Sequence, residues 1–141
     1  MVRILWADDE IESLKPHLIF LEEKGYNIEA VNSGNEAVNK FNQKPFDLVF
    51  LDENMPGMNG LIALEEIKRI NPNVPVIMIT KSEEEMIMEE AIGKQISDYL
   101  IKPVNPNQIL MAIKKLFDGK RLVSETNSST YQQKFQEIGF E

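Results

Sequence analysis

Five short, mostly apolar runs alternate along this chain with segments whose apolar residues recur at helical spacing. The runs cover residues 2–7, 28–31, 47–51, 76–80 and 99–101. The first, third and fourth are almost continuously apolar, which is typical of strands buried on both faces of a parallel sheet. The alternation predicts an α/β fold, a doubly wound sheet whose right-handed crossovers place helices on both sides.

The helix starts carry clear signals. Ser33 and Ser82 each precede a glutamate by three positions, so both predict a capping box, in which the serine oxygen accepts from a backbone amide of the first turn. Asn59 is predicted to cap the helix that follows it, and Asn105 to cap a helix whose first residue is proline.

Pro16 lies inside the first helical segment, among the apolar stripe Leu14, Leu18 and Leu21. Proline is tolerated only in the first turn of a helix, so we expect a kink or a late start there. His17, the only histidine, borders the stripe and is predicted to be a boundary residue and not a metal ligand.

The end of the chain differs from the rest. Asp118-Gly119 is predicted to end the last helix, and residues 124–130 form a polar run of linker type. Tyr131, Phe135 and Ile138 then recur at helical spacing. We expect a domain at residues 1–118, with residues 119–141 as a linker and the start of a C-terminal helix that belongs to a further part of a longer protein.

Charge and composition exclude several classes of binding site and argue against a place in a membrane. The net charge of −8 argues against direct binding of nucleic acid, because phosphate backbones select basic surfaces. The absence of cysteine excludes disulfides, thiolate metal sites and cysteine nucleophiles. No apolar stretch approaches the roughly 18 residues that span a membrane, and no leader precedes the first strand. We therefore expect a cytoplasmic protein without a membrane partner.

Chemically active residues stand where the predicted strands end: Asp8, Asp9, Asp52, Thr80 and Lys102. In an open parallel sheet, ligands bind beyond the carboxyl ends of the strands. Three carboxylates at one edge would repel each other unless a hard cation such as Mg²⁺ joined them. A carboxylate can also be a nucleophile that holds a phosphoryl group, with the ammonium and hydroxyl groups binding its oxygens. The pattern predicts a phosphorylation switch.

Four stretches carry a family resemblance: ILWADDE, FDLVFLDENMPGMNG, PVIMITK and ISDYLIKPVNPNQIL. Together they make residues 2–117 resemble the receiver domains of two-component response regulators. The resemblance implies a flavodoxin-like, doubly wound sheet of five parallel strands in the order 2-1-3-4-5, with five flanking helices.

The resemblance also implies roles for single residues around a magnesium ion. Asp52 would accept the phosphoryl group from the phosphohistidine of a sensor histidine kinase. Asp9 and Asp52 would ligate Mg²⁺ through their side chains, Asn54 would ligate it through its backbone carbonyl, and Asp8 would act mainly through water.

Further residues would respond to the phosphoryl group. Lys102 would contact it, and the peptide bond before Pro103 would be cis. Thr80 would move toward the phosphoryl oxygens, and Tyr99 would rotate inward behind it. The fourth helix, fifth strand and fifth helix would then carry the output, by forming a homodimer or by contacting a downstream effector domain or protein.

One position departs from the resemblance. Lys81 follows Thr80, where most receivers have a small residue. We expect its long side chain at the mouth of the site to alter dephosphorylation, in a direction that the sequence leaves open. Trp6, the only tryptophan, ends the first strand beside the acidic pair and should report binding by fluorescence.

Three alternatives remain at this point. A degenerate receiver would act only as a protein-binding module, against which the intact acidic residues argue. An enzyme of the haloacid dehalogenase type also forms a phosphoaspartate, but its nucleophile opens an Asp-x-Asp pattern at the first strand. A flavin- or nucleotide-binding module would need a phosphate-cradling loop where residues 7–10 are acidic. Neither enzyme turnover nor a cofactor other than Mg²⁺ is expected of this chain.

Overall fold

The computed structural model describes residues 1–81 and 83–126, with side chains described to residue 118. The chain divides into two compact units, Met1–Pro106 and Asn107–Glu141. The first contains the whole sheet and every residue of the site described below. The second contains nearly all of the last helix.

The sheet has five parallel strands in the order β2-β1-β3-β4-β5. The strands are β1 (Arg3–Ala7), β2 (Asn27–Val31), β3 (Leu48–Leu51), β4 (Val76–Thr80) and β5 (Asp98–Ile101). All of them lie within one residue of the ranges expected from the apolar runs. The predicted fold class and strand order are confirmed.

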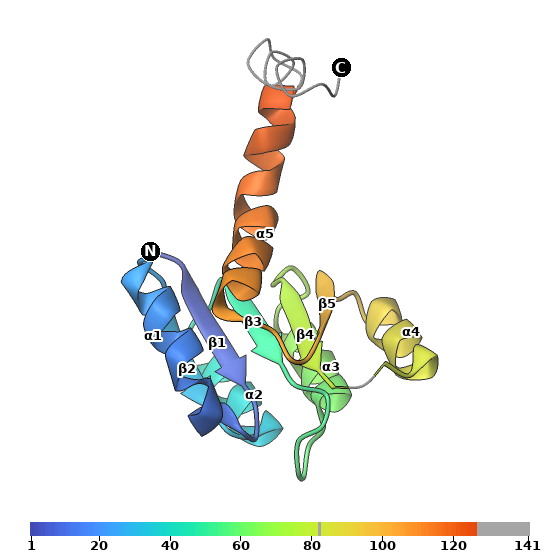
Figure 1. Ribbon diagram of the computed structural model, residues 1–141. Helices are drawn as coiled ribbons and strands as arrows, with labels where there is room; N and C mark the ends of the chain where they lie inside the picture. Colours follow the sequence, from blue (N-terminus) through green and yellow to red (C-terminus); the bar gives the residue numbers. More distant parts are fainter. Residues whose placement is uncertain (82, 127–141) are drawn as a thin grey trace. The chain divides into compact units, whose positions relative to one another are not determined.

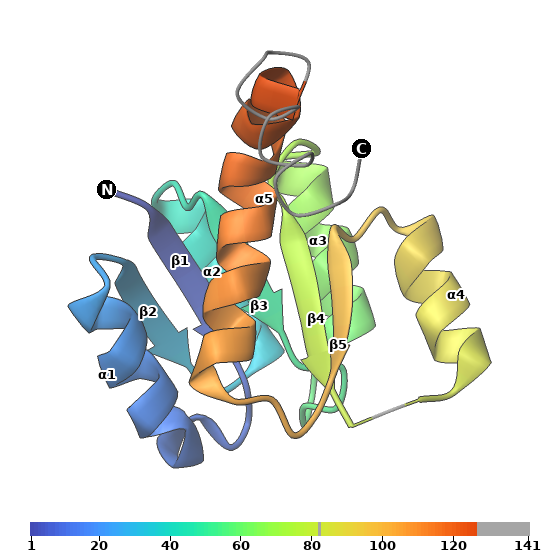
Figure 2. The ribbon, with the colours of Figure 1, turned by 45° about the horizontal axis from the view of Figure 1, so that its top comes forward.

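Helices cover both faces of this sheet (Figures 1 and 2). A 3₁₀ helix (Ile11–Leu14) leads into α1 (Lys15–Glu23), and α2 (Gly34–Gln43), α3 (Gly60–Ile70), α4 (Glu85–Gly93) and α5 (Pro106–Thr126) follow. In Figure 2, α1 lies in front of β1 and β2, whereas α2 and α3 lie behind the sheet and α4 lies beyond the β5 edge.

The strand register places the ends of β1 and β3 side by side. Ala7 and Leu51 are register partners, and the amide of Asp52 donates to the carbonyl of Ala7 at 3.0 Å. Asp8 and Asp52 therefore leave neighbouring strands at the same level. At the other edge Thr80 pairs with Ile101, and the amide of Lys102 donates to the carbonyl of Thr80 at 2.8 Å.

A buried apolar cluster beneath α2, α3 and α4 holds these strand ends in place. Leu61, Leu64 and Ile67 form the buried face of α3, as their spacing predicts, and Phe41 of α2 packs in the same cluster. Burying a side chain of this size contributes about 1.5–3 kcal/mol, so the cluster gives the site a rigid base.

Two predicted helix caps are confirmed. The side chain of Asn59 accepts from the amide of Ile62 at 2.9 Å at the start of α3. The hydroxyl of Ser33 accepts from the amide of Glu36 at 3.1 Å at the start of α2. The Glu36 carboxylate reaches back to the amide of Asn32 at 3.2 Å, one residue beyond the usual partner of a capping box.

The predicted capping box at Ser82 involves a residue outside the described part of the chain. The described residues show that α4 begins at Glu85 with Glu84 as its N-cap, later than the box predicts. Glu84 makes no side-chain cap, and its extended backbone lets the chain leave β4 before the helix starts. Glu83, Glu84 and Glu85 would all be favourable in the first turn of a helix, so their charges do not fix which residue begins it.

The expected late start at Pro16 is confirmed. The chain first forms one 3₁₀ turn, and α1 then begins at Lys15 with Pro16 in its first turn. The missing amide of proline costs no helical hydrogen bond there.

The last helix begins at Pro106, as predicted, and Ile109 and Ile113 of its apolar face are buried. It runs to Thr126, so the prediction that Asp118-Gly119 ends it is wrong. A single glycine destabilises a helix by only about 1 kcal/mol relative to alanine. The backbone hydrogen bonds of the continuing helix can outweigh that cost. The boundary at residue 118 stays a prediction, and residues 131–138 lie outside the described residues.

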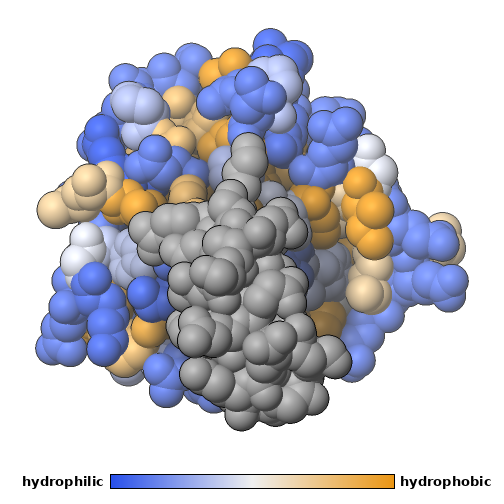
Figure 3. Space-filling view, turned by 90° about the horizontal axis from the view of Figure 1, so that it is seen from above, coloured by the Kyte–Doolittle hydropathy of each residue, from blue (hydrophilic) through white to orange (hydrophobic). Residues whose placement is uncertain are grey.

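The surface visible in Figure 3 is mostly hydrophilic, in line with the charged content of 27%. On the face seen in Figure 3, hydrophilic side chains cover most of the visible described residues, and hydrophobic side chains form smaller patches between them. Within residues 1–81 and 83–126, no helix has both the length and the apolar character needed to cross a bilayer.

Candidate functional site

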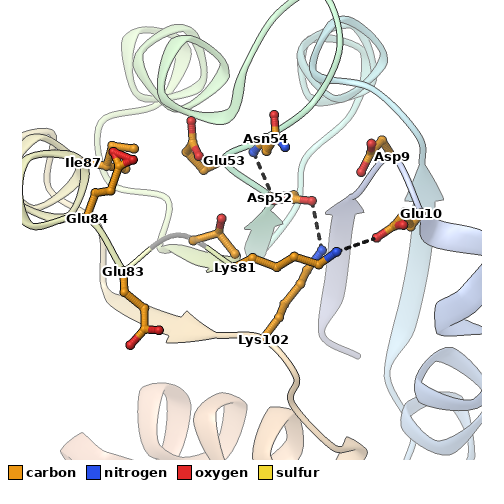
Figure 4. Close-up of a pocket in the computed structure, with 11 residues that line it drawn as sticks. Asp9, Glu10, Asp52, Glu53, Asn54, Lys81, Glu83, Glu84, Ile87 and Lys102 are labelled. Atoms are coloured by element: carbon orange, nitrogen blue, oxygen red, sulfur yellow. Dashed lines mark hydrogen bonds and ion pairs between the residues drawn. The ribbon is translucent and has the colours of Figure 1, made fainter.

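A cavity of about 510 Å³ opens beside the carboxyl ends of β1, β3, β4 and β5 (Figure 4). Its described lining residues are Asp9, Glu10, Asp52, Glu53, Asn54, Thr80, Lys81, Glu83, Glu84, Ile87 and Lys102. The sequence placed Asp9, Asp52, Asn54, Thr80, Lys81 and Lys102 at this site, and the structure brings all six together.

Lys102 lies between two buried carboxylates. Its Nζ is 2.7 Å from Oδ2 of Asp8 and 3.0 Å from Oδ2 of Asp52. Asp8 is fully buried, and Asp52 is 4% exposed. Such charges are stable in a folded protein only when a counter-charge and hydrogen bonds replace the lost water.

Backbone amides satisfy the other carboxylate oxygens. Oδ1 of Asp8 accepts from the amide of Glu10 at 2.8 Å, and Oδ1 of Asp52 accepts from the amide of Asn54 at 3.1 Å. The turns after β1 and β3 therefore fix the orientation of both carboxylates, and each keeps Oδ2 toward Lys102.

Burial and neighbouring charges both shift pKa values at this site. Burial raises the pKa of Asp52 and, with the charge of Asp8, outweighs the opposing effects of Lys102 and the Asn54 amide. Burial alone would lower the pKa of Lys102, but its contacts with Asp8 and Asp52 are stronger, so that pKa is raised and the ammonium keeps its charge. Glu53 also has a raised pKa, caused first by burial and then by Asp52 and Glu84.

The acidic residues suit a hard divalent cation. Carboxylate oxygens of Asp8, Asp9 and Glu10 lie within 4.8 Å of one another, with Asp8 buried and the other two exposed. This oxygen-only donor set is the kind that Mg²⁺ prefers. Asp52 stands outside the group of three in this conformation, with its Oδ2 against Lys102.

Glu10 is a residue that sequence reasoning missed. It lines the cavity, and its Oε1 is 3.8 Å from Nζ of Lys81. The available signal was its place as the third acid of the run after β1. Sequence reasoning also missed Glu53, Glu83 and Glu84. They line the cavity only because the loop after β3 and the loop after β4 come together there.

Three further predictions concern residues in or beside the cavity. Tyr99 is half-buried, packs against the apolar cluster and is not among the described cavity-lining residues. The Lys102–Pro103 bond is cis, as predicted. Thr80 is 1% exposed, at the end of β4 where it reaches the cavity.

His17 is half-buried and connects α1 to the segment after Lys102. Its Nε2 is 2.7 Å from the carbonyl oxygen of Val104, and its ring meets Trp6 edge-on at a centroid distance of 6.3 Å. Because a carbonyl only accepts, Nε2 carries the proton. No pattern in the sequence signals this long-range contact.

Comparison with known proteins identifies the family. Residues 4–114 match the response regulator receiver domain. The chain belongs to this family. A CheY-like receiver domain from Methanospirillum hungatei JF-1 is similar in structure, with a TM-score of 0.81 and 29% sequence identity, covering 86% of this chain and 97% of that one.

The relatives that this chain matches differ in length, so the match covers different shares of them. The chemotaxis protein CheY of Thermotoga maritima is 33% identical over 81% of this chain and 96% of its own length. The transcriptional regulatory protein ZraR of Escherichia coli O157:H7 is 30% identical over 98% of this chain. This receiver chain spans only 31% of the length of ZraR and 55% of a CpxR homolog from Haemophilus influenzae.

Proposed function

We propose that this receiver domain is a phosphorylation switch in which Asp52 accepts a phosphoryl group from the phosphohistidine of a sensor kinase. One observation carries the proposal: a buried aspartate ends the central strand β3 and meets Lys102 in a cavity that also holds Asp9 and Thr80. A carboxylate so placed can act as a nucleophile, and a lysine beside it can hold phosphoryl oxygens.

The chemistry is an exchange of one bond at phosphorus. An oxygen of Asp52 forms a bond to phosphorus as the P–N bond of phosphohistidine breaks, and that electron pair returns to the imidazole. The Asn54 amide orients the carboxylate, and Lys102 supplies positive charge next to it. Such transfers depend mostly on positioning and electrostatics.

Mg²⁺ fits this chemistry and the residues around it. Asp8, Asp9 and Asp52, with the backbone carbonyl of Asn54, would hold the ion, and it would neutralise negative charge on the phosphoryl group. Asp8, Asp9 and Glu10 already present their oxygens within one small region. The CheY of Borrelia burgdorferi, in a solved complex with CheX, BeF₃ and Mg²⁺, is 28% identical to this chain with a TM-score of 0.76.

The response would pass through β4 and β5. Thr80 and Tyr99 lie on these paired strands, and a shift of Thr80 toward phosphoryl oxygens would leave room for Tyr99 to turn inward. The elements α4, β5 and α5 would then carry the output to a homodimer or an effector, as a shift of a two-state equilibrium.

The whole protein would be a larger cytoplasmic regulator. The stretches ILWADDE, FLEEKGY, VFLDENMPG, MITKSEEE and ISDYLIKPVNP resemble the receiver of PorX, a regulator tied to type IX secretion in Bacteroidetes. On that resemblance, residues 1–118 are the receiver and residues 119–141 lead toward an effector domain like alkaline phosphatase. The receiver itself would turn over no substrate beyond forming and hydrolysing its own acyl phosphate.

Beryllofluoride, which mimics a phosphoryl group on aspartate, tests the proposal. With Mg²⁺ present, we expect it to change the fluorescence of Trp6, which is buried two residues before Asp8, and to shift the chain toward dimer. Asp52→Asn should show neither effect. A wild-type chain that ignores beryllofluoride at saturating Mg²⁺ would favour a degenerate, protein-binding receiver instead.

A further inference from the structure

Among the described residues that line the cavity, every exposed charged side chain except Lys81 is acidic. Besides Asp52, its described lining includes the carboxylates of Asp9, Glu10, Glu53, Glu83 and Glu84. Among the described lining residues, Lys81 is the only exposed cation. Clefts lined by one sign of charge select the charge of what enters them, so this rim opposes negatively charged phosphodonors.

Lys102 does little to offset that rim. Its side chain is only 14% exposed, and its ammonium group is already in contact with two carboxylates, Asp8 and Asp52. A donor that approaches from solvent therefore meets the charge of Lys81 first. The side chain of Lys81 is 74% exposed and directly follows β4.

Glu10 holds Lys81 on the far side of the opening. Figure 4 shows the Lys81 side chain reaching from the end of β4 toward Glu10, which follows β1. The Nζ–Oε1 distance of 3.8 Å makes this an ion pair at long range between two exposed groups. Exposed pairs of this kind are weak, so an incoming phosphoryl group can compete with Glu10 for the ammonium.

We propose that Lys81 and Glu10 together determine which phosphodonors this receiver accepts. Lys81 attracts the phosphoryl oxygens of a strongly anionic donor, and Glu10 reduces that attraction by holding Lys81. This inference rests on the proposed function of Asp52 and adds donor selectivity to it.

Two small donors separate charge from chemistry. Acetyl phosphate is a dianion near neutral pH, and phosphoramidate carries less negative charge because its nitrogen is protonated. In both reactions an oxygen of Asp52 bonds to phosphorus. The broken bond is P–O with acetate leaving in the first case, and P–N with ammonia leaving in the second. The ratio of the two phosphorylation rates therefore reports how strongly the residues at the rim attract or repel a negatively charged donor.

The test compares initial phosphorylation rates with acetyl phosphate and phosphoramidate at low ionic strength and saturating Mg²⁺. We expect Lys81→Ala to lower the acetyl phosphate to phosphoramidate ratio roughly two- to threefold, the size expected for one unit of charge some 8 Å away in water. Glu10→Gln should raise the same ratio by a similar factor.

A double variant tests whether Glu10 acts through Lys81. In the Lys81→Ala background, Glu10→Gln should raise the ratio less than it does in wild type, because no ammonium is left to release. Matched controls come from the exposed pair Glu12 and Lys15, whose Nζ and Oε1 are 3.2 Å apart away from the cavity. Glu12→Gln and Lys15→Ala change the net charge equally and should leave the ratio unchanged.

Salt gives a second readout. At about 1 M salt the screening length falls to about 3 Å, so the effects of both rim variants should disappear if they are electrostatic. Equal ratios in wild type, Lys81→Ala and Glu10→Gln, or shifts that persist at high salt, would overturn the inference. A wild-type chain that neither donor phosphorylates at Asp52 would overturn the proposed function itself.

Discussion

Asp52 is held in a position where its negative charge costs folding energy. Burial raises its pKa, and a carboxyl group whose pKa is raised in the folded state destabilises that state once it ionises. Removing the charge at Asp52 still leaves Lys102 paired with Asp8 at 2.7 Å. Ionised Asp52 therefore lowers the stability of the folded protein, and a cation bound beside it would reduce that cost.

Replacing Asp52 by asparagine should therefore stabilise the protein. In a metal-free buffer at pH 7 we expect Asp52→Asn to raise the free energy of unfolding by on the order of 1 kcal/mol. The gain is present above the raised folded pKa and fades as the pH falls toward 3.8, the ordinary value, because wild-type Asp52 then becomes neutral as well. Urea unfolding across this pH range measures it, and a variant less stable than wild type at pH 7 would count against this electrostatic account.

The acids at the strand ends could be assigned from sequence because parallel strands share one direction. Once five strands are parallel, whatever follows Ala7, Leu51 and Ile101 lies at the same edge. The contact of Lys81 with Glu10 and that of His17 with Val104 could not be assigned. They depend on side-chain reach between loops, for which the chain has no periodic signal.

Helix α3 begins at Gly60, which packs closely against the backbone of Asp52 and Glu53. A Cβ at Gly60 would overlap the carbonyl oxygen of Asp52 and press on the backbone of Glu53. The amide of Gly60 also donates to the carbonyl of Glu53 at 2.8 Å. The loop after β3 and the start of α3 therefore share one close contact, which only glycine allows.

Gly60→Ala should destabilise the fold by about 2 kcal/mol or more and weaken the response of Trp6 to Mg²⁺ and beryllofluoride, because the Asp52 backbone must move. Gly93 at the end of α4 supplies the matched control, because a Cβ added there would meet no heavy atom within 4 Å. Gly93→Ala should be neutral or stabilising by about 0.5 kcal/mol. Equal thermal stability of the two variants would contradict the close packing at Gly60.

Glu29 of β2 forms ion pairs with three basic side chains, from β1, from α2 and from the residue that follows α2. Its carboxylate lies 2.5 Å from Lys44, 3.6 Å from Lys40 and 3.9 Å from Arg3. The hydrogen bond from Lys44 is the strongest influence on the pKa of Glu29; it and the charges of Lys44 and Lys40 outweigh burial and lower that pKa.

A carboxyl group with a lowered pKa contributes stability above its unfolded pKa, here 4.5, and loses it as the pH falls through the folded value. Glu29→Gln should therefore cost about 0.5–1 kcal/mol at pH 7, as expected of a partly exposed ion pair network, and less at the lowest pH at which the protein stays folded. Chemical denaturation at both pH values measures this difference. A cost that is the same at both would show that packing and not charge is responsible.

Element boundaries were predictable where a cap or a proline fixes them, as at Ser33, Asn59 and Pro106. They were not predictable where the signal was repeated or weak. Three successive glutamates blurred the start of α4, and the single Gly119 did not stop α5. In both cases the chain followed the local balance of backbone hydrogen bonds and not the nearest motif.

On the scale of the whole molecule, the receiver fold gathers more carboxylates around the cavity than the two lysines in its described lining can neutralise. Ligands that bind only the folded state stabilise it in proportion to the logarithm of their concentration over Kd. Mg²⁺ alone, and more so Mg²⁺ with beryllofluoride, should raise the melting temperature. At about 100 times Kd the added stability is about 2.7 kcal/mol.

Calorimetry of wild type and Asp52→Asn in the same buffers tests this coupling. We expect beryllofluoride to raise the melting temperature of wild type further and to have no effect on the variant. Na⁺ at matched ionic strength should not raise the melting temperature of either protein. An equal increment in both proteins would place the binding outside the cavity at Asp52.

The most direct test of the central claim is the intact mass of the chain, followed by mapping of the modified residue, after incubation with Mg²⁺ and a small phosphodonor. The account predicts one added phosphoryl group on Asp52, released by hydroxylamine as an acyl phosphate and absent in Asp52→Asn. A phosphoryl group on another residue, or none on wild type under these conditions, would contradict it.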